Sequence, residues 1–457
     1  MRVLLLNPPA AKIAIRDYYC SKRTKSNYLF HPIDLLMQSG ILAPDHELVA
    51  LDATAERMSP EAALTEIASL RPEAVLGLWG AATDTEDEAF YRALRTRTAA
   101  PVFISGEVAL ADPPGWLRTR PFVDGVLLRF VSTGLRDWLR SGTPGPDLVV
   151  RSGEVIVGGL DPAPPREFSL GRPRQELFDS KNYRFSFARG RAFATVLTDF
   201  GCPFPCRFCV MSGLGHRLRP IGEGIDELRW LADRGVRELF VTDQCFGAAR
   251  RRSLELLEAM ARQVPGLSFT TFTRADLLDA ELVGAFKAAG CHTLIMGVES
   301  ASTEILSGYK KELDRGKLEA GFGLCRQAGI RTVATFIVGL PEDTEAGLRA
   351  TMALARRLDP DFVSYNVAVP RATTGLRESA LAEGLYDGAP NPDQAGDAAA
   401  MRTRSLSRDQ VAALKRAAVR DFYLRPGYLL RRLSSVSDLR ALLAEAREGL
   451  ALIAKNF

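Results

Sequence analysis

Three cysteines on one short loop constrain this chain more than any other feature. Cys202, Cys206 and Cys209 follow a predicted strand at 193–198 with the spacing Cys-x3-Cys-x2-Cys, and no fourth cysteine lies nearby. Cysteine thiolates hold iron–sulfur clusters, and a four-iron cluster takes one ligand per iron. Three ligands therefore predict a [4Fe-4S] cluster with one iron open to another molecule. The fold must present this loop at the end of a strand.

Two other interpretations of the cysteines stay open. Structural zinc sites usually use four ligands, and His216 is a candidate for the fourth. Alternatively, the three thiols are unrelated. A disulfide pair is disfavoured because the chain has 7 cysteines, an odd number, and no secretory segment. The spacing favours the cluster over both alternatives.

Length and charge narrow the class of protein. A chain of 457 residues with 46% hydrophobic content can bury two or three ordinary cores. A formal charge of +4 is small for this length and gives no general attraction to nucleic acid. No apolar run is long enough to span a bilayer, and the N-terminal run is too short for a signal peptide. We expect no transmembrane segment and a cytoplasmic location, where thiols stay reduced.

Residues 1–140 alternate strand-like and helix-like segments. The predicted strands are 3–6, 47–51, 74–78 and 102–105. Strands separated by helices indicate a parallel sheet covered on both faces, that is, a doubly wound, Rossmann-like α/β domain. Ligands of such folds bind at the carboxyl ends of the strands.

A breaker-rich stretch at 141–190 predicts a linker that contains a small hairpin at 147–158. Residues 191–390 then repeat six strand–helix units, with strands at 193–198, 238–242, 268–273, 293–297, 332–338 and 362–367. Six units make a partial (β/α)6 version of the eight-stranded TIM barrel, whose chemistry gathers at the strand C-termini. Residues 391–457 are predicted to be helical, with a capping box at Ser407 and Gln410.

The cysteine run, with Phe208 before its last cysteine, resembles the signature of the radical SAM superfamily. That resemblance implies a partial barrel whose open iron is chelated by the amino and carboxylate groups of S-adenosylmethionine. It also implies reduction of the cluster by a donor such as flavodoxin or ferredoxin. Cleavage of S-adenosylmethionine then gives a 5′-deoxyadenosyl radical, which abstracts hydrogen from an unactivated carbon.

The same resemblance assigns residues at successive strand ends to S-adenosylmethionine. Asp243 is the candidate for the amino group, with a turn aspartate as the alternative. Arg274 is the candidate for the carboxylate, because arginine binds carboxylates bidentately; an ion pair with Asp276 or Asp279 is its alternative. The run at 296–300 resembles a family motif near the ribose and contributes three candidates: Gly297, Glu299 and Ser300.

The N-terminal segment resembles the cobalamin-binding domain that precedes many radical SAM enzymes. The likeness rests on the opening Leu-Asn-Pro-Pro, the helix from Pro32 and the run Leu-Asp-Ala at 51–53. It implies cobalamin bound across the strand ends near Asn7, Pro8 and Gly106. The Asp-x-His-x-x-Gly loop of classical methyltransferases is absent from the sequence, and many radical SAM relatives bind cobalamin without a protein histidine. His31 and His46 are expected at a helix start or on the surface.

Together these resemblances predict a radical SAM enzyme that acts as a cobalamin-dependent methyltransferase. Its substrate would be a small molecule or lipid that is methylated at an unactivated carbon. One alternative is a radical cyclase or rearrangement enzyme that transfers no methyl group. An alternative of another class is a metal- or cluster-binding protein without turnover.

Overall fold

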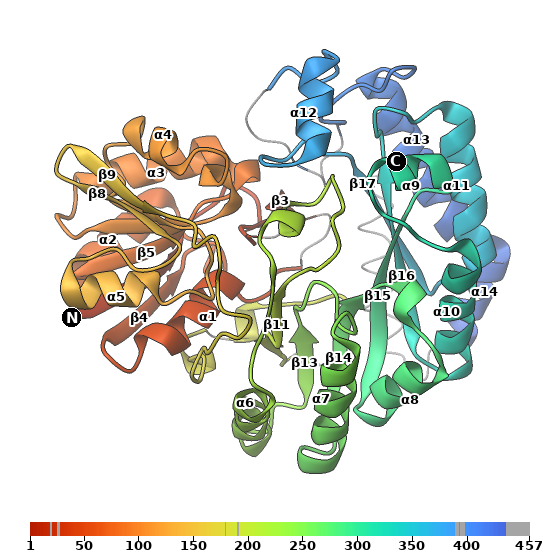
Figure 1. The fold of residues 1–457 in the computed structure, drawn as a ribbon, viewed down its shortest axis with the longest axis horizontal. Helices are drawn as coiled ribbons and strands as arrows, with labels where there is room; N and C mark the ends of the chain where they lie inside the picture. The colour runs from red at the N-terminus through yellow and green to blue at the C-terminus, as the bar shows by residue number, and fades with distance from the viewer. Residues whose placement is uncertain are drawn as a thin grey trace.

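The computed structural model describes residues 1–18, 21–24, 28–178, 180–189, 192–388, 393 and 398–435. The chain forms two lobes, each built on its own parallel sheet (Figure 1). The end of the predicted helical region, 436–457, lies outside the described residues, and so do residues 19, 20 and 25–27 near the N-terminus.

The N-terminal lobe contains a 7-stranded sheet with the order β4-β1-β5-β6-β7-β8-β9. Its parallel strands are β1 (Arg2–Asn7), β4 (Glu47–Asp52), β5 (Ala74–Leu78), β6 (Val102–Ser105) and β7 (Gly125–Leu127). β5 and β6 are buried along their whole length, as expected for strands that helices cover on both faces. Those helices are α1 (Ile33–Leu42), α2 (Pro60–Leu70), α3 (Asp84–Arg95), α4 (Pro113–Arg118) and α5 (Gly134–Ser141). The predicted doubly wound sheet is confirmed.

The hairpin predicted in the linker forms, but it belongs to the N-terminal sheet. β8 (Leu148–Ser152) pairs antiparallel with β7, and β9 (Val155–Gly159) pairs antiparallel with β8. Three buried apolar residues at the start of β8 explain this docking, since they complete the core at the sheet edge. The N-terminal domain therefore extends to about residue 159, and the linker starts after it.

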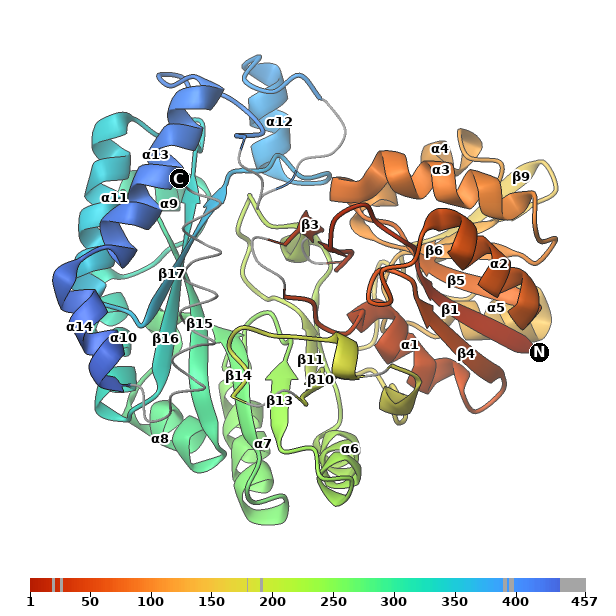
Figure 2. The same ribbon diagram turned by 180° about the vertical axis from the view of Figure 1, so that it is seen from behind.

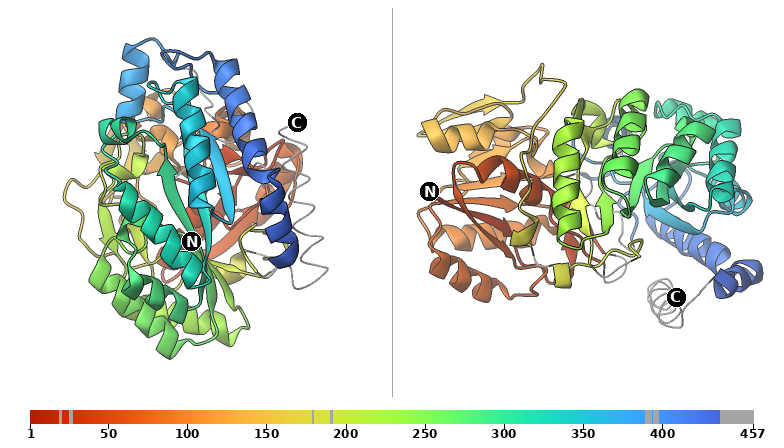
Figure 3. Two further views of the ribbon diagram at one scale, coloured as in Figure 1. Left: turned by 90° about the vertical axis from the view of Figure 1, so that its right-hand side faces the viewer. Right: turned by 90° about the horizontal axis from the view of Figure 1, so that it is seen from below.

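The second lobe contains a 6-stranded sheet with the order β10-β13-β14-β15-β16-β17, and every pairing is parallel. The strands are β10 (Ala194–Val196), β13 (Glu238–Val241), β14 (Ser268–Thr273), β15 (Cys291–Glu299), β16 (Arg331–Val338) and β17 (Phe362–Val367). Helices lie along its outer face (Figure 3): α6 (Ile221–Asp233), α7 (Arg250–Gln263), α8 (Ala280–Ala288), α10 (Arg315–Gln327) and α11 (Glu345–Leu358). The predicted partial barrel is confirmed.

Two features complete this lobe. A short hairpin of β11 (Asp199–Gly201) and β12 (His216–Leu218), which the sequence did not predict, frames the cysteine loop. Among the C-terminal elements, α13 (Arg408–Tyr423) starts at the predicted capping box and is followed by α14 (Pro426–Ser435). None of the helices in the described ranges has the length and apolar character needed to cross a membrane.

The two lobes lie side by side (Figure 2). Buried apolar residues of both lobes belong to one hydrophobic cluster. Phe130, which follows β7, packs edge-on against Phe200 at the entrance of the cysteine loop, with ring centroids 5.2 Å apart. His31 of the N-terminal lobe hydrogen-bonds through Nδ1 to the hydroxyl of Thr195 in β10, at 3.0 Å. The start of the cysteine loop therefore packs against the N-terminal domain.

Candidate functional site

The cysteine loop is fixed at both ends by backbone contacts. Gly201 has φ +87°, and a Cβ there would lie 1.7 Å from the carbonyl oxygen of Gly215, so only glycine fits this turn. Arg207 donates its backbone N–H to the carbonyl of Tyr309 at 2.9 Å and accepts from the N–H of Leu376 at 3.1 Å. These contacts position the loop at the mouth of the barrel before any ligand is bound.

The three thiols occupy separate positions on this loop. Among the described residues, no three His, Cys, Asp or Glu side chains converge on a point that a single metal ion would fill. A four-iron cluster takes each thiolate on a different iron. His216, the possible fourth zinc ligand, directs Nε2 toward Asp199, 3.4 Å from Oδ2.

Burial raises the pKa of the Cys206 thiol, and it raises that of Cys209 to about 12. A bound metal is therefore what would keep Cys209 deprotonated at neutral pH. Cys202 differs, because a hydrogen bond with the buried thiol of Cys245 lowers its pKa to about 7. Cys245 thus contacts the loop directly.

Asp243 follows β13 and is fully buried. Its Oδ1 accepts backbone N–H groups of Thr198 at 2.6 Å and Asp199 at 3.1 Å, and its Oδ2 accepts the Thr198 hydroxyl. Burial, with repulsion from Asp199, raises the pKa of Asp243 to about 7. Both oxygens of Asp243 hold the turn that leads into the cysteine loop. This is the geometry expected of a turn aspartate, the alternative role predicted for this residue.

Arg274 lies at the end of β14, beside the cysteine loop. It forms a bidentate pair with Asp276 at 3.0 and 2.8 Å, as one predicted alternative required, and donates to the carbonyl of Glu312 at 2.7 Å. The guanidinium carbon also lies 4.0 Å from the ring centroid of Phe204 in the loop. Arg274 is therefore held in place next to the thiols.

Glu299 and Gly297 lie together at the end of β15. Glu299 has φ +66°, a strained value for a residue with a side chain, at a shift in strand register. Its Oε1 lies 2.6 Å from Nζ of Lys311, and both side chains are buried. A Cβ at Gly297 would lie 2.2 Å from that oxygen and 2.7 Å from the ammonium nitrogen. Ser300 accepts the N–H of Ser302 at 3.1 Å.

Lys311 is the site residue that sequence reasoning missed. It follows the short helix α9 (Thr303–Gly308) within a polar run, a pattern typical of a solvated turn. Only the tertiary fold brings its ammonium next to Glu299 and 5.9 Å from the ring centroid of Phe208 in the cysteine loop. No local sequence signal distinguishes it from Lys310 beside it.

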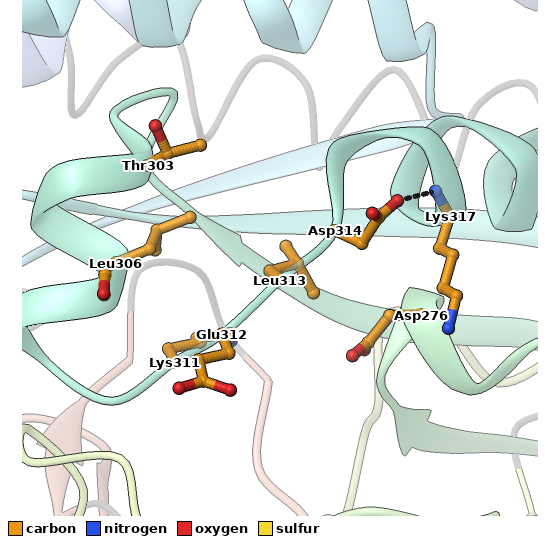
Figure 4. Close-up of a pocket in the computed structure, with 9 residues that line it drawn as sticks. Asp276, Thr303, Leu306, Lys311, Glu312, Leu313, Asp314 and Lys317 are labelled. Atoms are coloured by element: carbon orange, nitrogen blue, oxygen red, sulfur yellow. Dashed lines mark hydrogen bonds between the residues drawn. The ribbon is translucent and has the colours of Figure 1, made fainter.

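A cavity of about 400 Å³ opens next to these ion pairs (Figure 4). Its lining carries charges of both signs together with apolar side chains: Asp276, Thr303, Leu306, Ser307, Lys311, Glu312, Leu313, Asp314 and Lys317. Asp276, which pairs with Arg274, and Lys311, which pairs with Glu299, both line this cavity. A polar ligand fits this lining better than an apolar one.

The N-terminal candidates are placed differently from the barrel candidates. Asn7 bonds Asp52 at 2.9 Å and accepts from Arg16 at 3.0 Å, and the carbonyl of Pro8 also accepts from Arg16 at 2.8 Å. Asn7 and Pro8 thus hold the chain's own loop. Gly106 has φ +153°, and its missing Cβ lets the backbone approach the carbonyl of Trp79, 2.0 Å from the position a Cβ would take.

Both histidines of this domain also have structural surroundings. His31 lies just before α1, as predicted, and packs against Tyr183 and Phe193. Burial lowers its pKa to about 3, so the imidazole is neutral. His46 lies in the turn before β4, at the opposite edge of the sheet from the strand C-termini.

Comparisons with known proteins agree with this geometry. Residues 197–355 match the family described as the Radical SAM superfamily. The chain is 23% identical over 415 residues to an uncharacterized methyltransferase, PH0819, of Pyrococcus horikoshii, covering 88% of this chain and 89% of that protein.

Two solved structures share the fold over nearly the whole chain. The radical S-adenosylmethionine methyltransferase TsrM from Kitasatospora setae, with cobalamin and a [4Fe-4S] cluster bound, has a TM-score of 0.65 at 20% identity, covering 92% of this chain and 85% of that one. The cobalamin-dependent S-adenosylmethionine radical enzyme OxsB, with aqua-cobalamin and S-adenosylmethionine bound, has a TM-score of 0.70 at 13% identity, covering 100% and 72%.

Proposed function

Because residues 197–355 form a radical SAM domain, we propose that the chain is a cobalamin-dependent radical SAM methyltransferase that acts on an unactivated carbon. One observation carries this proposal. The three-thiol loop at the barrel mouth is packed directly on the C-terminal strand edge of a doubly wound domain, through Phe200 and Phe130. This packing supports the proposal, because ligands bind at the strand C-termini in both kinds of fold, so the two proposed cofactor sites would share one junction.

The cysteine loop fits the cluster, since Cys202, Cys206 and Cys209 present three thiols and leave one iron for S-adenosylmethionine. When bound, the cluster supplies the electron that cleaves S-adenosylmethionine to a 5′-deoxyadenosyl radical, and cobalamin supplies the methyl group. The chain itself binds and orients these groups. A small electron-transfer protein such as flavodoxin or ferredoxin would deliver the electron.

The charged residues around the thiols fit the zwitterionic end of S-adenosylmethionine. Arg274 and Lys311 are the cations of this set, and either is placed to bind the methionyl carboxylate. Glu299 offers an acceptor for an ammonium or for ribose hydroxyls. Asp243 would act through the loop it holds, because its oxygens already accept three hydrogen bonds.

The hydrogen-bonding groups at the carboxyl ends of the strands in the N-terminal sheet fit cobalamin. Two buried carboxyl oxygens there, Oδ1 of Asp34 and Oε2 of Glu107, receive no hydrogen bond from the described residues. The periphery of a corrinoid carries primary amides, which are N–H donors that such oxygens require. His31 is engaged through Nδ1 with the hydroxyl of Thr195 in the barrel lobe, and His46 precedes β4 at the opposite edge of the sheet.

The test is an anaerobic incubation of the full chain, loaded with iron, sulfide and cobalamin, with S-adenosylmethionine, a reductant and candidate small-molecule or lipid substrates. We expect 5′-deoxyadenosine and S-adenosylhomocysteine in equal amounts, and a product heavier by one methylene. 5′-Deoxyadenosine without S-adenosylhomocysteine would favour the cyclase or rearrangement alternative. The absence of both products would favour a protein without turnover.

A further inference from the structure

One buried ion pair joins the two domains at the carboxyl ends of the strands in the N-terminal sheet. Glu107 follows β6, and Arg371 lies in the barrel lobe between β17 and the helix α12 (Gly375–Ala382). Nη1 of Arg371 binds Oε1 of Glu107, and the two side chains are only 7% and 5% exposed. Arg371 also donates to the carbonyl of Ser21, at 3.4 Å. The pair thus links three segments that are distant in sequence.

The other oxygen of Glu107 is left without a partner. Oε2 is buried, and no group among the described residues donates a hydrogen bond to it. A buried acceptor without a donor is costly, so the free protein is incomplete at this position. Oδ1 of Asp34 is in the same condition, and the other oxygen of Asp34 accepts the hydroxyl of Ser105, two residues before Glu107.

These orphaned oxygens lie where doubly wound domains bind ligands, at the carboxyl end of a parallel strand. The missing group must be an N–H or O–H donor. Under the proposed function, on which this inference rests, the donor-bearing ligand at this edge is the corrinoid with its peripheral amides.

We propose that Glu107 couples corrinoid binding to domain docking. One oxygen holds the barrel through Arg371, while the other accepts an N–H of a corrinoid amide. Glu107 is then a positioning residue that orients the corrinoid relative to the cysteine loop. Since coupling is reciprocal, bound corrinoid strengthens the Glu107–Arg371 contact, and the contact strengthens corrinoid binding.

The experiment titrates the full chain with hydroxocobalamin, followed by the visible spectrum of the corrinoid, and repeats this for three variants. Arg371→Ala removes the docking contact, together with the bond to Ser21, and keeps the Glu107 side chain. The double variant Glu107→Ala/Arg371→Ala removes both partners, so that no unpaired charge stays buried. Glu227→Gln is the matched control, because it disrupts a buried pair with Arg219 that lies within the barrel lobe.

We expect the double variant to bind hydroxocobalamin about tenfold more weakly than Arg371→Ala, as for a lost hydrogen bond to a charged acceptor. The control should bind like the unmodified chain. Hydrogen exchange of the backbone at 105–109 and 368–374 should slow on adding hydroxocobalamin, and this slowing should disappear in the double variant.

Two results would overturn the inference while leaving the proposed function intact. One is equal affinity of the double variant and Arg371→Ala, which would remove Glu107 from the corrinoid site. The other is hydrogen exchange at the junction that does not respond to hydroxocobalamin. If neither the unmodified chain nor the control binds hydroxocobalamin, the cobalamin role itself fails.

Discussion

The carboxyl edges of the two sheets follow one architectural rule but are filled in different ways. At the barrel mouth, Arg274 and Lys311 lie beside aromatic rings of the cysteine loop, and Asp276 and Lys311 line a cavity of about 400 Å³. At the N-terminal edge, the loop after β1 folds back, and Arg16 pairs with fully buried Asp87. The comparison teaches that charged groups at the barrel mouth border open space, whereas the Arg16–Asp87 pair of the N-terminal lobe is enclosed within the fold.

The largest effect is expected at the cysteine loop. Cys206→Ala removes one of three ligands, so iron and sulfide per chain should fall to background, and 5′-deoxyadenosine formation with them. Cys325→Ala is the control, because this cysteine lies on the buried face of α10, and the variant should keep both the iron content and 5′-deoxyadenosine formation. Full iron content in the Cys206 variant would remove this cysteine from the site.

The next largest effect is on the free energy of unfolding, and it compares a buried ion pair of the N-terminal lobe with an exposed ion pair of the barrel lobe. Asp87→Ala leaves the Arg16 guanidinium buried without its charge partner, which costs about 3–5 kcal/mol of unfolding free energy. Urea denaturation measures this loss, and S-adenosylmethionine binding by the folded variant should not change. Glu345→Ala, which breaks the exposed pair with Arg349, should cost no more than about 0.5 kcal/mol. Equal losses in the two variants would contradict a structural role for the buried pair.

A smaller effect tests the barrel pair by ligand binding. Gly297→Ala places a methyl group against both Glu299 and Lys311, so we expect S-adenosylmethionine to bind about tenfold more weakly, or about 1.4 kcal/mol. Equilibrium dialysis measures this change. Gly323→Ala in α10 is the matched control: its Cβ meets nothing within 4 Å, and it should stabilise the helix by about 1 kcal/mol. Unchanged affinity in the Gly297 variant would place the pair outside the binding site.

The smallest effect concerns pH at the N-terminal edge. Burial raises the pKa of Asp34 to about 8, so the folded chain keeps a proton that the unfolded chain loses near pH 4. The stabilisation from this proton is complete below about pH 4 and is lost as pH rises through about 8.

Between pH 7 and 8 the unmodified chain should lose about 1 kcal/mol through Asp34, and Asp34→Asn should flatten this fall. Unfolding free energies measured at the two pH values test the sign. His31 acts in the opposite direction, because its lowered pKa removes stability only as pH falls below about 6.5. A fall of equal size in the asparagine variant would mean that another group titrates.

The sequence predicted the strands well because most are short runs of apolar and β-branched residues bounded by breakers. The predicted range 268–273 matches β14 (Ser268–Thr273) without any shift. It did not predict the hairpin of β11 and β12, whose three-residue strands carry no period, nor that β8 and β9 would complete the N-terminal sheet. Those placements depend on partners that are distant in the chain.

The site residues likewise divide into those that the sequence predicted and those that it did not. The spacing of Cys202, Cys206 and Cys209 was readable because all three ligands lie on one loop, where sequence distance and spatial distance nearly coincide. Lys311 was not readable, since its partner Glu299 is brought to it only by the turn after α9. Asp243 was readable as a strand-end acid, but its bonds to the Thr198 turn were not.

By itself the sequence determined the alternation of strands and helices, the six-unit barrel and the three-thiol loop, because local hydrophobic pattern and ligand spacing decide these features. Only the tertiary structure decided which charged groups are already paired and which are left for a ligand. Glu107 shows the reason: whether a buried oxygen has a partner depends on Arg371, which the other lobe supplies.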